Sequence, residues 1–228
     1  MTKRQILVLF SMALSLTIFG VRGLAQSRSL AATPPMGWNS WNRYGCQVSD
    51  ALLRKQADAM VTSGLKAAGY QFINLDDCWE GQRDAEGYIQ PNERFPDMKA
   101  LADYIHSKGL KFGIYSSPGP KTCAHYEGSY GHEQQDAEIY ARWGVDYLKY
   151  DWCSARDVYQ PAEYPSAIRK MHDAIVRTGR PIVYSIHGRG PVWEWAAAAG
   201  AVTDALTHIR RVRDNIDGCL TEVKRALT

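Results

Sequence analysis

The fold of this chain is decided by a stretch that reads Trp143-Gly144-Val145-Asp146-Tyr147-Leu148-Lys149-Tyr150-Asp151. A helical segment ends at the glycine, the usual C-terminal cap of a helix, and a short apolar strand begins two or three residues later. Three other stretches follow the same plan around Gly69, Gly109 and Gly179, so that successive glycines lie 40, 35 and 35 residues apart. The repetition predicts a series of helix–strand units.

Apolar residues recur with helical spacing before each of these glycines. The four stripes are Leu53, Ala57, Met60 and Val61; Leu101, Tyr104 and Ile105; Ala137, Tyr140 and Ala141; and Ile168, Met171, Ile175 and Val176. Strands that alternate with such helices form βαβ units around a parallel sheet, whose buried strands are apolar on both faces. The sheet is then either doubly wound or closed into a barrel.

Polar residues at the predicted strand ends favour the barrel. They are Asp76 and Asp77, Tyr115, Lys149 and Asp151, and Ser185. Polar groups that converge at the carboxyl ends of the strands are typical of barrel enzymes, whereas no glycine-rich loop follows the first strand to support a dinucleotide site. We therefore predict an α/β fold of the (β/α)8, or TIM-barrel, type.

The barrel is expected to be incomplete. With 35–41 as the first strand, about five β/α units are present by residue 199, and a whole barrel takes about 250 residues. We expect residues 26–200 to form this partial barrel and residues 201–228 to form a diverged, basic tail. Within the tail, the run from Arg210 to Arg213 is interpreted as a solvated helix face rather than a nucleic-acid patch.

The first 25 residues resemble a secretory signal peptide. Lys3 and Arg4 precede an apolar run from residue 6 to 21, and Gly23-Leu24-Ala25 provides a small-x-small cleavage site. The alternative, a membrane anchor, fits less well because the run is short for a span of about 20 apolar residues. We expect a secreted or periplasmic protein with no membrane contact after cleavage.

Charge and cysteine content limit the partners and cofactors that the protein is expected to have. The chain has 27 basic and 24 acidic residues, and cleavage after Ala25 would leave 24 of each, which gives no indication of a nucleic-acid partner. The five cysteines are Cys46, Cys78, Cys123, Cys153 and Cys219. Export permits disulfides among them, and no metal-ligand spacing is present, so neither a metal nor a cofactor is predicted.

Lys149 and Asp151 lie two residues apart on the predicted strand, so their side chains point the same way. A nearby ammonium keeps a carboxylate ionised, which is what a nucleophile attacking a sugar carbon requires. A structural ion pair is the alternative for this pair, and a helix cap or turn is the alternative for Asp76 and Asp77. Arg83 and Asp84 are expected to form an exposed ion pair of little energetic weight.

Several motifs together identify a family. They are Thr33-Pro34-Pro35-Met36-Gly37-Trp38-Asn39-Ser40-Trp41, Leu75-Asp76-Asp77-Cys78-Trp79, Gln82-Arg83-Asp84, Arg94-Phe95-Pro96, the segment from Ser107 to Tyr115, Gly131 and Lys149-Tyr150-Asp151. In this order they resemble the glycoside hydrolase family 27 α-galactosidases, or melibiases, over residues 33 to 195.

The resemblance implies an exported, retaining α-galactosidase that acts on terminal α-galactosyl groups of oligosaccharides or glycoconjugates without a cofactor. Asp151 would be the nucleophile, and Lys149 would hold a sugar hydroxyl and keep Asp151 charged. The remaining sugar contacts would come from Trp41, Asp76, Asp77 and Tyr115. The resemblance also implies disulfides Cys46–Cys78 and Cys123–Cys153, which leaves Cys219 as the odd thiol.

The second catalytic group departs from the family pattern. A retaining glycosidase needs an acid/base partner, which in this family is an Asp on the sixth strand. Here the aligned position holds His208, which can act as a general acid, and Asp204 lies out of register. The segment from Ile186 to Gly190 also lacks the cysteine that the family usually has.

Two alternatives therefore stand beside the α-galactosidase hypothesis. One is a catalytically inactive fragment, or a remnant that binds galactosides without cleaving them, because the acid is replaced. The other is an α-N-acetylgalactosaminidase, distinguished by whether the pocket accepts a 2-acetamido group. Loss of the acid alone would cost about 10²–10⁴-fold in rate.

Overall fold

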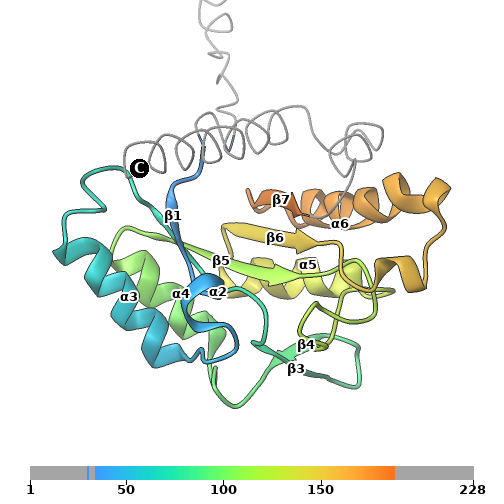
Figure 1. Cartoon of the computed structure of the whole chain (residues 1–228), viewed down its shortest axis with the longest axis horizontal. Helices are drawn as coiled ribbons and strands as arrows, with labels where there is room; N and C mark the ends of the chain where they lie inside the picture. The colour runs from blue at the N-terminus through green and yellow to red at the C-terminus, as the bar shows by residue number, and fades with distance from the viewer. Residues whose placement is uncertain (1–29, 31–33, 188–228) are drawn as a thin grey trace, which may run out of the picture.

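The computed structural model describes Leu30 and residues 34–187 (Figure 1). Five parallel strands form the main sheet: β1 (Gly37–Asn39), β2 (Phe72–Asn74), β5 (Lys111–Ser116), β6 (Tyr147–Asp151) and β7 (Val183–His187). Their order in the sheet, β1-β2-β5-β6-β7, follows their order along the chain. A doubly wound sheet reverses its strand order at a switch point, so the steady progression confirms the wall of an incomplete barrel.

The main helices connect these strands. They are α3 (Asp50–Thr62), α4 (Met98–Ser107), α5 (Glu133–Trp143) and α6 (Tyr164–Thr178), with a short α2 (Trp41–Tyr44) and two 3₁₀ turns, η1 (Ala155–Asp157) and η2 (Pro161–Glu163). Contacts run from α3 to α4, from α4 to α5 and from α5 to α6, so the helices form one layer beside the sheet. Within the described residues no helix is long and apolar enough to cross a membrane.

Most residues of the predicted apolar stripes are buried, Tyr104 and Ala141 are half-buried, and two valines are exposed. Leu53, Met60 and Ile175 are buried, but Val61 and Val176 are 38% and 62% exposed. Each of these valines directly follows a buried residue, and consecutive residues point about 100° apart around a helix. The valines therefore fall outside the buried face.

The predicted cap glycines adopt left-handed backbone conformations. Gly144 and Gly179 cap α5 and α6 with φ angles of 88° and 71°. The prediction was wrong for α3, which ends at Thr62 instead of near Gly69. A turn fills the interval, because Gly64 already has a φ of 83° and interrupts the helix.

A two-stranded antiparallel hairpin, which the repeat pattern did not predict, follows β2. It consists of β3 (Glu80–Arg83) and β4 (Ile89–Pro91). Arg83 anchors it by pairing with Asp136 on α5, with side chains only 12% and 1% exposed. The expected exposed pair of Arg83 with Asp84 is therefore wrong: Asp84 instead accepts the backbone N–H of Tyr88 within the hairpin turn.

Candidate active site

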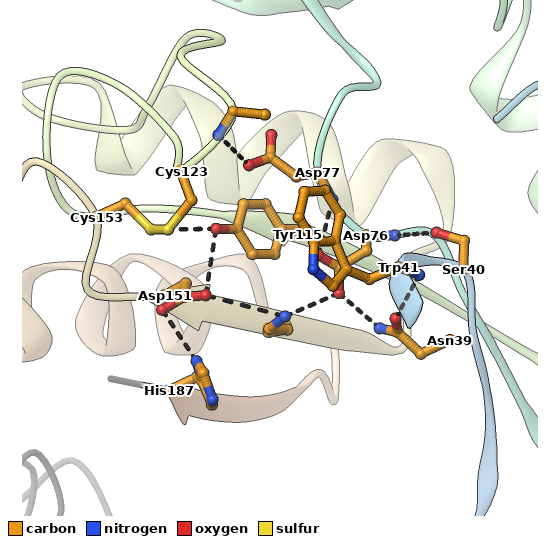
Figure 2. Close-up of polar contacts among 12 residues, drawn as sticks. Asn39, Ser40, Trp41, Asp76, Asp77, Tyr115, Cys123, Asp151, Cys153 and His187 are labelled. Carbon is orange, nitrogen blue, oxygen red and sulfur yellow. Dashed lines mark hydrogen bonds and ion pairs between the residues drawn. A yellow bond between two sulfur atoms is a disulfide. The ribbon is translucent and has the colours of Figure 1, made fainter. Parts of the chain in front are cut away.

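Strand register brings the predicted site residues together at the carboxyl end of the sheet. Tyr115 on β5 pairs with Lys149 on β6, and Asp151 on β6 pairs with His187 on β7. Register partners in a parallel sheet project to the same face, as do residues two apart on one strand. All four side chains therefore gather at one end of the barrel wall, where Figure 2 labels Tyr115, Asp151 and His187.

Asp151, the last residue of β6, has a side chain that is 14% exposed and surrounded by donors. Its Oδ2 accepts a hydrogen bond from the Tyr115 hydroxyl at 3.3 Å, and its Oδ1 lies 3.0 Å from Nδ1 of His187. Burial alone would raise the pKa of Asp151, but contact with His187, followed by the charge of Lys149 and the Tyr115 hydrogen bond, lowers it below its ordinary value. The carboxylate is thus held ionised.

Lys149 lies between two carboxylates. Its Nζ is 2.9 Å from Oδ2 of Asp76 and 3.9 Å from Oδ2 of Asp151, so Asp76 is the closer partner. The ammonium also lies 4.9 Å from the centre of the Tyr115 ring, where a cation is attracted to the aromatic face. Lys149 thus links the end of β2 to the end of β6.

Asp76 is buried and held by residues at the end of β1 and directly after it. Its Oδ2 accepts a hydrogen bond from Nδ2 of Asn39 at 2.7 Å, and its backbone N–H donates to the Ser40 hydroxyl at 3.0 Å. The Asn39 side chain also accepts the backbone N–H of Trp41 at 2.9 Å. Sequence reasoning missed Asn39, although its position at the end of a strand, inside a quoted motif, was an available signal.

Asp77 is only 1% exposed. Its Oδ1 and Oδ2 each accept a backbone hydrogen bond at 2.8 Å, from Cys78 and Ala124 respectively. Burial raises its pKa, an effect opposed by Thr122 and these backbone groups and increased by the charge of Asp76. An ionised carboxylate can accept about four hydrogen bonds, so with Cys78, Ala124 and Thr122 as donors about one position remains for a ligand.

The aromatic residues Tyr115 and Trp41 differ in exposure. Tyr115 is 1% exposed, and burial together with the charge of Asp151 raises its pKa well above its ordinary range, so the phenol remains a neutral donor. Trp41 is 39% exposed at the start of α2, which leaves its ring accessible to a ligand. Figure 2 shows both rings at the same end of the strands as Asp76 and Asp151.

Two disulfides border the site. They join Cys46 to Cys78 and Cys123 to Cys153, with Cα atoms 5.2 and 5.1 Å apart, which is the pairing that the resemblance implied. In the described part of the chain, one group of three residues has metal-ligand geometry, namely Cys123, Asp151 and Cys153. Its two sulfurs are bonded to each other, so they offer no thiolate to a metal.

A cavity of about 640 Å³ opens beside Asp151. It is lined by the Cys123–Cys153 disulfide, by His187 and by segments 120–125 and 151–157. Its lining includes Asp151 but none of the five expected sugar-binding residues, so those residues lie on the other side of Asp151 from the cavity. An ionised carboxylate next to a neutral phenol and an ammonium is suited to attack a bound electrophilic carbon.

Comparison with known proteins decides the family. The family model described as alpha galactosidase A matches residues 33–226. The chain belongs to the family 27 α-galactosidases, or melibiases. It is 50% identical over 202 residues to alpha-galactosidase A of Cellvibrio japonicus, covering 87% of this chain and 49% of the relative. It is also 50% identical over 190 residues to the alpha-galactosidase of Cyamopsis tetragonoloba, covering 80% and 45%.

Solved structures of α-galactosidases share the fold of this family member. An alpha-galactosidase of Saccharomyces cerevisiae, determined with raffinose, aligns with a TM-score of 0.66 and 43% identity, covering 68% of this chain and 35% of that one. The chain spans about half the length of the curated α-galactosidases that it matches.

The family match extends past residue 195, where the resemblance drawn from motifs ended. The expected acid/base position His208 lies outside the described residues, as do the expected signal peptide, the 201–228 tail and Cys219. The structure thus describes the proposed nucleophile and all the proposed sugar-binding residues of this α-galactosidase family member. His187, directly beside Asp151, received no role in the sequence analysis.

Proposed function

We propose that this chain carries the nucleophile and the galactose-binding face of a retaining α-galactosidase, and that its substrates are oligosaccharides or glycoconjugates with terminal α-galactosyl groups. The observation that carries the proposal is the state of Asp151. Its carboxylate is held ionised at a strand end, beside a cavity, by His187, Lys149 and Tyr115. A covalent glycosyl intermediate requires such a carboxylate.

In the proposed reaction, a carboxylate oxygen of Asp151 attacks the anomeric carbon while the bond to the aglycone oxygen breaks. The departing oxygen takes a proton from an acid, for which His208 stands at the expected position. Water then attacks the anomeric carbon of the galactosyl ester, gives a proton to the same group, now acting as a base, and releases galactose with retained configuration and the free Asp151 carboxylate.

The remaining residues would bind and orient the sugar. Asp76 and Asp77 are charged acceptors for galactose hydroxyls, and charge-assisted hydrogen bonds are the stronger kind. Lys149, already 2.9 Å from Asp76, would donate to a hydroxyl between the two carboxylates. Trp41 would pack on the apolar face of the ring, and Tyr115 would form the wall behind it.

The comparisons support this substrate class and are compatible with export. The relatives are named as α-galactosidases, and raffinose, found with the yeast structure, ends in an α-galactosyl group. The two disulfides fit an oxidising compartment, because such bonds are rare in the cytosol of mesophiles. We therefore include a secreted or periplasmic location in the proposal.

The test is hydrolysis of 2,4-dinitrophenyl α-galactoside by the full chain, because this leaving group needs little protonation. We expect turnover that is lost in Asp151→Asn and kept in Asp157→Asn, which removes an exposed carboxylate from the same cavity. Equal turnover in wild type and Asp151→Asn would refute the assignment of the nucleophile. The 2-acetamido analogue, assayed in parallel, separates an α-galactosidase from an α-N-acetylgalactosaminidase.

Binding without hydrolysis is the second candidate function. It is favoured by one observation, that the described residues include every proposed sugar contact while the acid position holds a histidine. Galactose binding by calorimetry, with no turnover of the activated substrate, would replace the enzyme proposal with this one.

A further inference from the structure

Glu80 is a buried carboxyl group that the proposed reaction does not use. It is the first residue of β3 and is only 2% exposed. Its Oε2 accepts the backbone N–H of Cys78 at 3.0 Å. Its Oε1 is buried and has no hydrogen-bond partner among the described residues. A buried polar atom without a partner is uncommon and requires a physical explanation.

Glu80 shares its hydrogen-bond donor with Asp77. The same Cys78 N–H donates to Oδ1 of Asp77 at 2.8 Å, so oxygens of two carboxyl groups converge on one hydrogen. Cys78 adopts a left-handed conformation with a φ of 80°, which is uncommon for a residue other than glycine. Two carboxylates at one site disfavour each other's ionisation, so one of this pair is expected to hold a proton.

The surroundings indicate that Glu80 is the neutral partner. Asp77 has a second backbone donor, Ala124, which stabilises its anion. The guanidinium groups on the neighbouring segments are engaged elsewhere, that of Arg94 with the carbonyls of Cys46 and Cys78 and that of Arg83 with Asp136. Glu80 therefore has no described cation to balance a charge. Burial, followed by the charge of Asp77, raises the pKa of Glu80 well above its ordinary value, and these effects outweigh the backbone N–H groups of Glu80, Cys78 and Trp79, which lower it.

We propose that Glu80 is a positioning residue that stays protonated and thereby keeps Asp77 as the anion that binds galactose. The role of Asp77 in this inference rests on the proposed function, whereas the proton on Glu80 does not. When Glu80 ionises, it competes with Asp77 for the Cys78 N–H and repels it. Sugar binding should therefore weaken at alkaline pH, where Glu80 is ionised.

The first test is carboxyl ¹³C NMR of the full chain labelled at Asp and Glu, with resonances assigned through Glu80→Gln and Asp77→Asn. We expect the Glu80 resonance to remain at the protonated position at pH 7 and to titrate only at alkaline pH. The Asp77 resonance should shift in the same pH range in wild type and stay unchanged there in Glu80→Gln. Glu86→Gln, an exposed glutamate of the same hairpin, is the matched control.

A Glu80 resonance at the ionised position in wild type at pH 7 would overturn the proposal. An Asp77 resonance that ignores the titration of Glu80 would also overturn it, because the two groups would then be independent.

The second test is galactose affinity by calorimetry against pH. We expect wild type and Glu86→Gln to bind galactose about tenfold more weakly once Glu80 ionises, which is the approximate cost of losing one hydrogen bond to a charged group. Glu80→Gln should lose no affinity in the same pH range. The same alkaline loss in Glu80→Gln would refute the link to sugar binding. If no variant binds galactose at any pH, the proposed function fails, and the NMR titration still decides the proton on Glu80.

Discussion

His187 and Asp151 are register partners at the ends of adjacent strands, and Nδ1 of His187 lies 3.0 Å from Oδ1 of Asp151. The imidazole is 66% exposed and the carboxylate only 14%, so His187 lies on the solvent side of the proposed nucleophile. The other oxygen, Oδ2, faces Tyr115 and Lys149. Attack on a sugar carbon therefore requires a ligand to enter between these partners or to displace one of them.

Replacing His187 by alanine should shift the acidic limb of the pH–activity profile to higher pH. Contact with His187 is the main influence that lowers the pKa of Asp151, so its loss raises that pKa. In wild type the nucleophile protonates below the ordinary aspartate value of about 3.9, and in His187→Ala it protonates at higher pH. The kcat/KM profile on the dinitrophenyl galactoside should show the shift.

His125→Asn is the matched control for this prediction, because His125 is an exposed histidine of the same cavity. Asparagine is chosen because residue 125 has a φ of 68°, a conformation that asparagine tolerates. An acid limb that is identical in wild type and His187→Ala would show that His187 does not set the ionisation of Asp151.

Asn39→Ala should weaken galactose binding by about tenfold or more. The Asn39 amide donates to Asp76 at 2.7 Å, and a hydrogen bond to a charged group contributes about 1.5–3 kcal/mol. Its loss leaves the Asp76 carboxylate held by Lys149 and by the Asp77 backbone N–H, and also removes the acceptor for the Trp41 N–H. Calorimetry with galactose measures the effect, and unchanged affinity would remove Asn39 from the site. Gln134→Ala, which removes an amide that donates to the Glu138 carboxylate on α5 at 2.8 Å, tests for a general structural effect.

Arg83→Met should lower the free energy of unfolding by about 3–5 kcal/mol, because it leaves the buried Asp136 without its partner. Arg54→Met breaks the more exposed pair with Asp50, one helical turn away on α3, and should cost about 0.3–0.5 kcal/mol. Urea denaturation of both variants measures the difference. Equal losses in the free energy of unfolding would mean that the buried ion pair stabilises the fold no more than the surface pair does.

Much of the barrel wall could be predicted from the sequence because each unit is encoded locally. An apolar stripe, a glycine and a short apolar strand recur within about 35 residues, and alternation along β6 places Lys149 and Asp151 on one face. The hairpin was missed because its strands are short and largely polar, as at Glu80 and Gln82.

The partners of the site residues could not be read from local pattern. Lys149 lies closer to Asp76 than to Asp151, its neighbour in sequence, because its ammonium passes over the Tyr115 ring on the intervening strand β5. That path depends on the register of three strands. The pairing of His187 with Asp151 likewise follows from how β7 aligns with β6.

Removing the Cys123–Cys153 disulfide should lower both stability and activity. The bond closes a segment with a sequence separation of 30, and a cross-link of that length contributes about 3–4 kcal/mol. It also fixes the loop whose Cys153 sulfur lies 3.4 Å from the Tyr115 hydroxyl, which in turn donates to Asp151. The double variant Cys123→Ser with Cys153→Ser should therefore unfold at a lower urea concentration and show reduced kcat/KM on the dinitrophenyl galactoside.

The matching pair of substitutions at Cys46 and Cys78 removes a disulfide of similar span, 32 residues, whose Cys78 lies beside Asp77. We expect that variant to weaken galactose binding more than the reactivity of Asp151, and the reverse order of effects would contradict the assignment of the two loops.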